Sequence, residues 1–261
     1  MKKEKGKFNW FKNPFVQKGI FTLIAFFFLF VVWWIAYAWI GNGYLLPSPK
    51  ATLKTACLAL GEKSFYTAYF STILRALIAF FISFILAGIF AVIAYTVRSF
   101  SQLFAPIIAF LRGLPTMAVL LMILLWSSAK IAPIIVSYLV LFPMLYSTFF
   151  TALSETDEGL LEMCKVYKIK TKEKICKLYL PSIAPYVCKE GTACLSFGLK
   201  LIVSAEIMSN TFQSLGGKMQ TASLYGEIPT LFALVLICFI TGYLFECIGL
   251  LLSSAVERRV K

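Results

Sequence analysis

The stretch Tyr66 to Val97, YTAYFSTILRALIAFFISFILAGIFAVIAYTV, decides the fold class. Its only charged residue is Arg75. It is also longer than the roughly 20 apolar residues that an α-helix needs to cross the hydrocarbon core of a bilayer. Such a segment predicts a membrane-spanning helix that tilts or protrudes beyond the bilayer. The chain is therefore expected to be an integral membrane protein.

The composition of the whole chain supports this prediction. Of the 261 residues, 60% are hydrophobic and 14% are charged, whereas soluble proteins average about 25% charged residues. Apolar runs recur between short polar breaks, which predicts one all-α membrane domain over residues 19–255 with about six transmembrane helices. The other expected helices span 19–40, 103–126 with a break at Arg112-Gly113-Leu114-Pro115, 131–153, 185–208 and 229–255.

The distribution of Lys and Arg predicts the orientation. The N-terminal segment 1–18 holds six lysines, the polar segment 154–179 holds six, and the tail 256–261 holds three cations. Loops on the opposite side hold five lysines, two of them in the connection 41–61, which we expect to be exposed. By the positive-inside rule, both termini and the 154–179 segment are cytoplasmic.

A cleavable signal peptide is the alternative at the N-terminus, and Ala36-Tyr37-Ala38 resembles a peptidase site. The apolar run 19–40, however, exceeds the roughly 7 to 15 residues of a signal core. We therefore expect this segment to be retained as a membrane anchor.

Several functional classes are disfavoured. The net charge of +13 lies in short segments between apolar runs, which argues against a nucleic-acid partner. The seven cysteines form no CxxC pair, so neither a disulfide framework nor a zinc site is expected. Histidine is absent, which removes the commonest general base. No Walker A motif exists, because Gly217-Lys218 is followed by Met219, so the chain is not expected to be an ATPase.

The segment 154–180 has the pattern of two short amphipathic helices. Ser154-Glu155-Thr156-Asp157 has capping-box spacing, and a second helix is expected from Lys172 to Leu180, closed by Pro181. Helices this short need another surface for their apolar faces. That surface is the protein's own helices, anionic lipid or a groove on a partner.

Glu162-Met163-Cys164 followed by Leu180-Pro181 resembles the cytoplasmic coupling motif of binding-protein-dependent ABC import permeases, in the spacing of the nitrate, sulfonate and taurine branch. Four other segments look like the same branch. They are Leu46-Pro47-Ser48-Pro49, Thr72 to Arg75, Leu111 to Pro115, and Ala205-Glu206 with Leu215-Gly216-Gly217.

The resemblance implies a type I ABC importer permease in a bacterial plasma membrane. Its expected partners are a cytoplasmic ATPase dimer that binds ATP and Mg²⁺, an external solute-binding protein and a second permease copy; no cofactor is expected in this chain. The residues expected to couple to the ATPase are Leu161, Glu162, Met163, Cys164, Lys165, Lys168, Leu180 and Pro181. Lys168 stands where the family usually has glycine, and a left-handed backbone there would cost lysine roughly 1 kcal/mol.

Three charged residues are candidates for a solute pathway, namely Arg112, Lys200 and Glu206. Charges in membrane segments are costly and often line a cavity or pair with a partner. Arg112 and Lys200 would attract a small anionic solute. The alternatives place Arg112 at the cytoplasmic interface and pair Lys200 with a carboxylate such as Glu206.

The main alternative function is an ion-coupled secondary carrier, which would transport without an ATPase and often contains inverted repeats. No repeat is evident between the two halves of the sequence. A membrane-embedded enzyme has little support, because no metal-ligand cluster or nucleophile motif is present.

Overall fold

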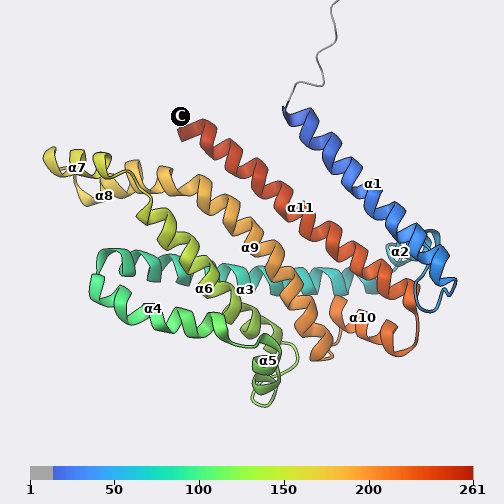
Figure 1. Cartoon of the computed structure of the whole chain (residues 1–261). Helices are drawn as coiled ribbons and strands as arrows, with labels where there is room; N and C mark the ends of the chain where they lie inside the picture. The colour runs from blue at the N-terminus through green and yellow to red at the C-terminus, as the bar shows by residue number, and fades with distance from the viewer. Residues whose placement is uncertain (1–13, 261) are drawn as a thin grey trace, which may run out of the picture.

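The computed structural model describes residues 14–260, and every regular element in this range is a helix (Figure 1). Within the range, the side chains of residues 14–19, 23, 158, 160, 161, 165, 171, 172, 176, 257, 259 and 260 are not described. The elements are α1 (Pro14–Ile40), α2 (Pro49–Ala59), α3 (Lys63–Thr96), α4 (Arg98–Gly113), α5 (Thr116–Leu124), α6 (Ala132–Ser154), α7 (Glu158–Val166), α8 (Thr171–Lys174), a π-helical turn (Ile175–Tyr179), α9 (Leu180–Met208), α10 (Leu215–Leu224) and α11 (Ile228–Val260).

Five of the helical segments in the described range are long and apolar enough to cross a membrane, and α4 with α5 counts as a sixth when the bent pair is taken as one span. The two halves of the broken span meet at 88°. The bend falls at Leu114-Pro115, where the backbone is extended because the residue before proline disfavours the helical conformation. The prediction of about six spans with a break at residues 112–115 is confirmed.

The core forms along α3, whose buried face carries small side chains three or four positions apart. Ala76 and Ala79 pack in a cluster with residues of α9 and α10, whereas Ala87 and Ala91 pack in a cluster with residues of α6. Small residues on one face allow helices in a bilayer to approach closely. The 34-residue helix expected to tilt is thus held by a seam of alanines.

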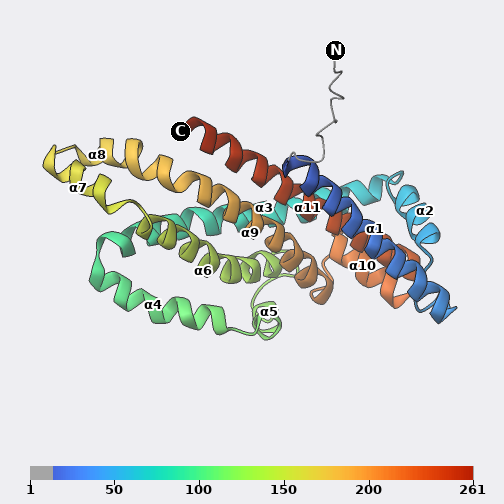
Figure 2. The ribbon, with the colours of Figure 1, turned by 45° about the horizontal axis from the view of Figure 1, so that its top comes forward.

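Helix α9 packs between α6 and α11 in a similar way (Figure 2). A Cβ on Gly198 would lie 2.9 Å from Leu141 Cδ1 of α6, so only glycine fits this contact without a shift. On the other side, Ser196 Oγ donates to Gly242 O of α11 at 3.0 Å. These close contacts fix the position of α9, which carries several of the candidate functional residues.

When α4 and α5 are taken as one span, successive spans alternate in direction, so α2, the 125–131 loop and α10 share one side of the membrane. The loop containing α7 and α8 shares the other side with the start of α1 and the end of α11. Figure 1 shows α7 and α8 projecting from the helical bundle at the end opposite α2. We call these sides the outer and the inner side.

Two expected boundaries differ from the structure. The connection 41–61 contains helix α2, capped by Ser48, whose Oγ accepts from Ala51 N at 3.1 Å. Serine followed by proline is a helix-start pattern, and α2 also buries Thr52 and Ala56. The tail expected at 256–261 forms the last turns of α11 through Val260. Most of the predicted basic segment 1–18 lies outside the described residues.

The capping box predicted at Ser154 is wrong. Ser154 lies in the last turn of α6, where its Oγ donates to Phe150 O at 2.8 Å. Asp157 precedes α7 and accepts from Gly159 N at 2.7 Å. Both residues are known helix-start types, and the length of α6 decides which one caps the next helix.

The second short helix does not end at Pro181 as predicted, because it continues through the π-helical turn into α9. Leu180 N donates to Ile175 O across this turn, five residues back. A proline lacks the amide for the usual bond and clashes with the carbonyl four residues earlier. The wider π-helical turn accommodates Pro181 without breaking the helix.

Candidate functional site

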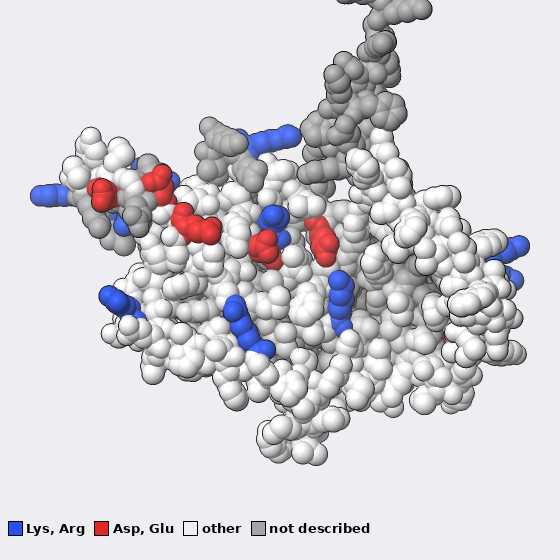
Figure 3. Space-filling model, in the orientation of Figure 1, with Lys and Arg blue, Asp and Glu red and all other residues white. Residues whose placement is uncertain are grey.

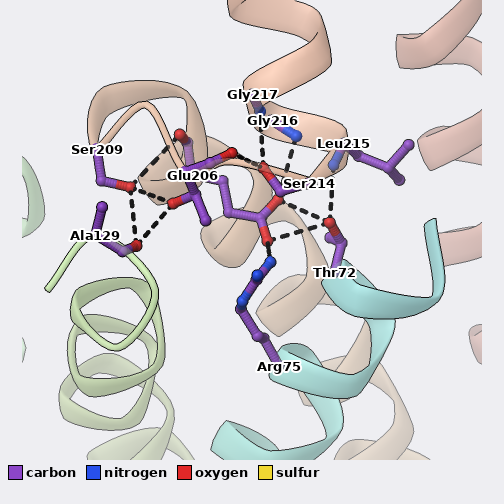
Figure 4. Close-up of polar contacts among 10 residues, drawn as sticks. Thr72, Arg75, Ala129, Glu206, Ser209, Ser214, Leu215, Gly216 and Gly217 are labelled. Atoms are coloured by element: carbon purple, nitrogen blue, oxygen red, sulfur yellow. Dashed lines mark hydrogen bonds and ion pairs between the residues drawn. The ribbon is translucent and has the colours of Figure 1, made fainter. Parts of the chain in front are cut away.

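A buried carboxylate, Glu206, joins three helices near the outer end of α9. Its side chain is 0% exposed. It accepts hydrogen bonds from Thr72 Oγ1 at 2.8 Å, Arg75 Nη1 at 2.6 Å and Gly216 N at 3.2 Å (Figure 4). We call Thr72, Arg75, Glu206 and Gly216 the outer hub.

Local sequence places each group of the outer hub. Thr72 and Arg75 are three residues apart on α3 and therefore share one helix face. Gly216 lies in the first turn of α10, where free amides and the helix dipole favour a carboxylate. Thr72 Oγ1 also accepts from Leu215 N at 2.9 Å. The start of α10 is thus bound to both α3 and α9.

The N-terminus of α10 lies so close to α9 that only glycine fits at position 216. A Cβ at this position would meet the Glu206 side chain and would lie 2.6 Å from Val203 O and 2.8 Å from Ile207 N. Two of these three atoms belong to the backbone of α9 and cannot rotate away. The pair Leu215-Gly216 therefore packs the N-terminus of α10 directly on α9.

The end of α9 is closed by a left-handed residue, Asn210, with φ 48°. Thr211 N donates to Glu206 O at 3.1 Å, and Asn210 N donates to Ile207 O at 3.3 Å, the two bonds of a Schellman motif. Thr211 Oγ1 then donates to Ala129 O at 2.7 Å in the α5–α6 loop. The same turn thus links two outer loops beside the hub (Figure 4).

The predicted pairing of Lys200 with Glu206 is wrong, because Glu206 forms its ion pair with Arg75 of α3. Residues six apart on a helix point in different directions, whereas those three or four apart are neighbours. Lys200 is exposed on another face of α9. Glu206 is enclosed by protein, so this chain does not present it to a solute as predicted.

Lys200 lies on an exposed stripe of α9. The stripe also contains Tyr186, Lys189, Ala193 and Phe197, at spacings of three or four residues. It includes two cations, and the half-buried Glu190 lies at its edge near Tyr186. Exposed cations in the middle of a membrane-spanning helix are costly against lipid. We therefore expect this face to contact water, solute or another protein surface and not lipid.

Arg112 lies in the last turn of α4 at the bend of the broken span. It is exposed and donates through Nη2 to Ser147 Oγ of α6 and, at 3.5 Å, to Pro143 O. A cation at a helix C-terminus is also favoured by the helix dipole. The structure thus anchors Arg112 on α6 while leaving part of its side chain open.

The inner loop presents apolar side chains that no described residue covers. Met163 is 55% exposed, Tyr167 72% and Leu180 58%. Glu162 is exposed beside them, whereas Cys164 and Pro181 are half-buried. The side chains of Leu161 and Lys165 lie outside the described residues. Figure 3 shows acidic and basic side chains at the end of the molecule where Figure 1 places α7 and α8.

Lys168 adopts the left-handed conformation, with φ 50°. Ile169 N donates to Cys164 O at 3.0 Å, the longer bond of a Schellman motif at the end of α7. The chain therefore keeps the turn shape that glycine usually provides and accepts the strain of a lysine there.

A cavity of about 300 Å³ lies between α7 and the α8 segment. Met163, Cys164, Tyr167 and Ile169 line its α7 side, and Glu173, Lys174, Lys177 and Leu178 line the other. Lys174 Nζ also lies 5.3 Å from the centre of the Tyr179 ring, a cation–π contact that orders the α8 side.

Sequence reasoning did not assign a role to Arg75 or Thr72. A signal was available, since Arg75 is the only charge in a long apolar run and such a charge needs a partner. The identity of that partner depends on which helix packs against α3.

The comparisons with known proteins agree with this architecture. Residues 84–261 match the family described as the binding-protein-dependent transport system inner membrane component. Probable ABC transporter permease proteins of Brucella melitensis and Brucella abortus are each 24% identical over 217 residues, covering 83% of this chain and 86% or 85% of the relative.

A solved structure titled as an inward-facing conformation of the MetNI methionine ABC transporter shares the fold. The match has a TM-score of 0.62 and 18% identity, and it covers 72% of this chain and 94% of the other. A second crystal form of the same transporter gives 0.63 and 18%, with 72% of this chain and 93% of that one covered.

The family match spans more than half of the chain, and the described helices have the type I importer permease fold. The chain therefore belongs to the family of binding-protein-dependent transport system inner membrane components, as the permease component of an ABC transporter.

Proposed function

We propose that this chain is the permease of an ATP-driven importer for a small anionic solute, in a bacterial plasma membrane with both termini cytoplasmic. Two copies would enclose the pathway. A separate ATPase dimer would bind ATP and Mg²⁺, and an external solute-binding protein would deliver the solute. Family membership favours this function over an ion-coupled secondary carrier.

The observation that carries the proposal is the exposed apolar surface of the α7 loop. Met163 on α7 and Tyr167 directly after it are more than half exposed, and α7 projects from the inner end of the bundle (Figure 1). Burying such side chains in a partner's groove is favourable by roughly 25 cal/mol per Å². Exposed Glu162 adds a charge that a basic group of the ATPase would meet at the rim.

The α8 side of the loop supplies the mechanical connection. The chain runs from α8 through the π-helical turn into α9 without interruption. Closure of the ATPase dimer would move the loop, and α9 would move with it because the helix between them is continuous. Lys168, Leu180 and Pro181 would set the angle between the docked helix α7 and α9.

The anionic preference is supported by the exposed cations. Lys200 lies on the exposed stripe of α9, ten residues beyond Glu190, and Arg112 is held on α6 by Ser147. In a pathway with low-dielectric walls, such charges raise the local concentration of an anion. The outer cavity of about 730 Å³ is lined by apolar side chains and by both signs of charge, with Lys218, Glu62 and Glu227 in its lining, and would offer a groove for the solute-binding protein.

The experiment is purification of the tagged chain from its native membrane in mild detergent, followed by mass spectrometry of bound proteins. We expect a P-loop ATPase in equal amount to the permease. Glu162→Arg should lose the ATPase because it reverses the charge at the docking helix. Glu227→Arg is the matched control, since Glu227 is exposed on the outer side.

An intact native chain without any ATPase would contradict the proposal. Equal loss of ATPase from both variants would also contradict docking at α7. In either case, uptake driven by an ion gradient in vesicles holding this chain alone would be the next measurement.

A further inference from the structure

Helix α2 lies across the bundle at its outer end. Figure 2 shows α2 running crosswise to α3, beside the end of α1. It packs on the outer ends of α11 and α1. At 11 residues it is too short to span a bilayer. A helix in this position lies in the plane of the outer interface.

The faces of α2 differ in character. Pro49, Thr52 and Ala56 are buried against the protein. Beside this buried face lies an apolar flank of Leu53 (49% exposed) and Cys57, continued by Leu60 (46%) just after the helix. Leu58, 64% exposed, is on the opposite side of the helix and lines the outer cavity. Next to the apolar flank come Lys50 and Lys54, four residues apart and both exposed. This order of buried, apolar and cationic faces is typical of a helix whose open side meets a lipid interface.

Aromatic residues mark the depth of this interface. Trp39 is 92% exposed at the end of α1, and Tyr44 is 83% exposed in the turn that leads to α2. Tryptophan and tyrosine concentrate at the level of the lipid headgroups. Helix α2 follows directly and contacts α1, so it lies at that level.

The charge on α2 is positive, and it comes from Lys50 and Lys54. Among the described residues, no ion pair involves Lys50 or Lys54. The nearest acid in sequence, Glu62, accepts from Ser64 and lies 4.0 Å from Lys218. Figure 3 shows blue side chains projecting at the edge where Figure 1 places α2.

From these observations we propose that α2 is a binding site for anionic phospholipid of the outer leaflet. Lys50 and Lys54 bind the headgroup phosphate and the negative charge of the headgroup, while Leu53, Cys57 and Leu60 enter the acyl-chain boundary. The site is independent of the coupling function proposed above, since it lies on the opposite side of the membrane and involves none of the same residues.

The first test is native mass spectrometry of the purified permease titrated with phosphatidylglycerol or phosphatidylethanolamine. The permease should retain phosphatidylglycerol preferentially. The double variant Lys50→Gln with Lys54→Gln should bind it about tenfold more weakly or worse, because each lysine contributes to the attraction of an anionic lipid. Lys130→Gln is the matched control, since Lys130 is exposed in another outer loop, and it should bind as the native chain does.

The second test locates the apolar flank. A variant that keeps Cys57 as its sole cysteine is labelled with an environment-sensitive fluorophore and placed in lipid nanodiscs. Lipids brominated on the acyl chain should quench the probe, and aqueous iodide should quench it weakly.

Equal weakening in the Lys130 control and the double variant would overturn the site. Strong iodide quenching without bromolipid quenching would place α2 in water. Protection from both quenchers would mean that a protein surface, such as a second copy of this chain, covers the helix. Both of these results overturn the proposal.

Discussion

Arg75 on α3 and Glu206 on α9 are 131 positions apart in sequence, and Arg75 Nη1 lies 2.6 Å from Glu206 Oε1. The carboxylate also accepts from Gly216 N at the start of α10. One buried ion pair thus holds the outer ends of two spanning helices and an outer helix together.

Removing the cation from this pair should destabilise the permease. Arg75→Met leaves the Glu206 carboxylate buried without a counter-charge, which costs about 3–5 kcal/mol. The thermal unfolding midpoint in detergent should fall clearly. Adding Glu206→Gln should recover part of the loss, because the uncompensated charge is then absent.

Lys200→Met is the control for this prediction. It removes a cation from a neighbouring helix at an exposed position, and its midpoint should stay near that of the native chain. Equal midpoints for Arg75→Met and the native chain would show that the outer hub contributes no stability.

A methyl group at position 216 should disrupt the contact between α9 and α10. Gly216→Ala places a Cβ against two backbone atoms of α9, and overpacking of this kind costs about 1–3 kcal/mol. Gly43→Ala provides the comparison, since a Cβ there meets nothing within 4 Å. Size-exclusion chromatography and thermal unfolding of both variants measure the difference, and identical behaviour would contradict the close contact.

Lys168→Gly should stabilise the turn after α7. Glycine relieves the left-handed strain of roughly 1 kcal/mol, partly offset by its greater freedom in the unfolded chain. Hydrogen exchange at Ile169 N, which donates to Cys164 O, should become slower. Lys170→Gly is the control, because Lys170 does not have a positive φ, and slower exchange in that variant would argue against strain relief.

Loss of the Lys200 charge should weaken the binding of an anionic solute during uptake and leave the basal ATPase activity unchanged. In the reconstituted transporter, Lys200→Gln should raise the KM for uptake by about fivefold, as expected for losing an attraction of about 1 kcal/mol across partly screened contacts. Nitrate and an alkanesulfonate are the solutes to assay first, as members of the classes suggested by the resemblance. Lys130→Gln, in an outer loop, should leave the KM unchanged. A fall in basal ATPase activity with unchanged KM would contradict a role for Lys200 in the pathway.

The sequence alone determined the class of protein and its division into spans. Long apolar runs have to form helices in a bilayer, because every backbone polar group must be paired within the segment. The break at Leu114-Pro115 was predictable for a similar reason, since proline imposes its constraint on the adjacent residue wherever it stands. The motif indicated that Lys168 stands at the turn after α7, whereas the left-handed backbone of this residue is seen in the structure.

Other features depended on packing and could not be predicted locally. Asp157, rather than Ser154, caps α7 because the preceding helix uses Ser154 in its own last turn. The helix through Pro181 continues because a π-helical turn absorbs the missing amide bond.

The partner of Glu206 was decided by tertiary structure alone. Within α9, Lys200 is near in sequence but faces away, because six residues do not bring side chains to one helix face. Arg75 is distant in sequence but adjacent in space, since the outer half of α3 packs beside α9 and α10. Local periodicity fixes which residues share a face of one helix, whereas the choice of which faces meet depends on how all the helices pack together.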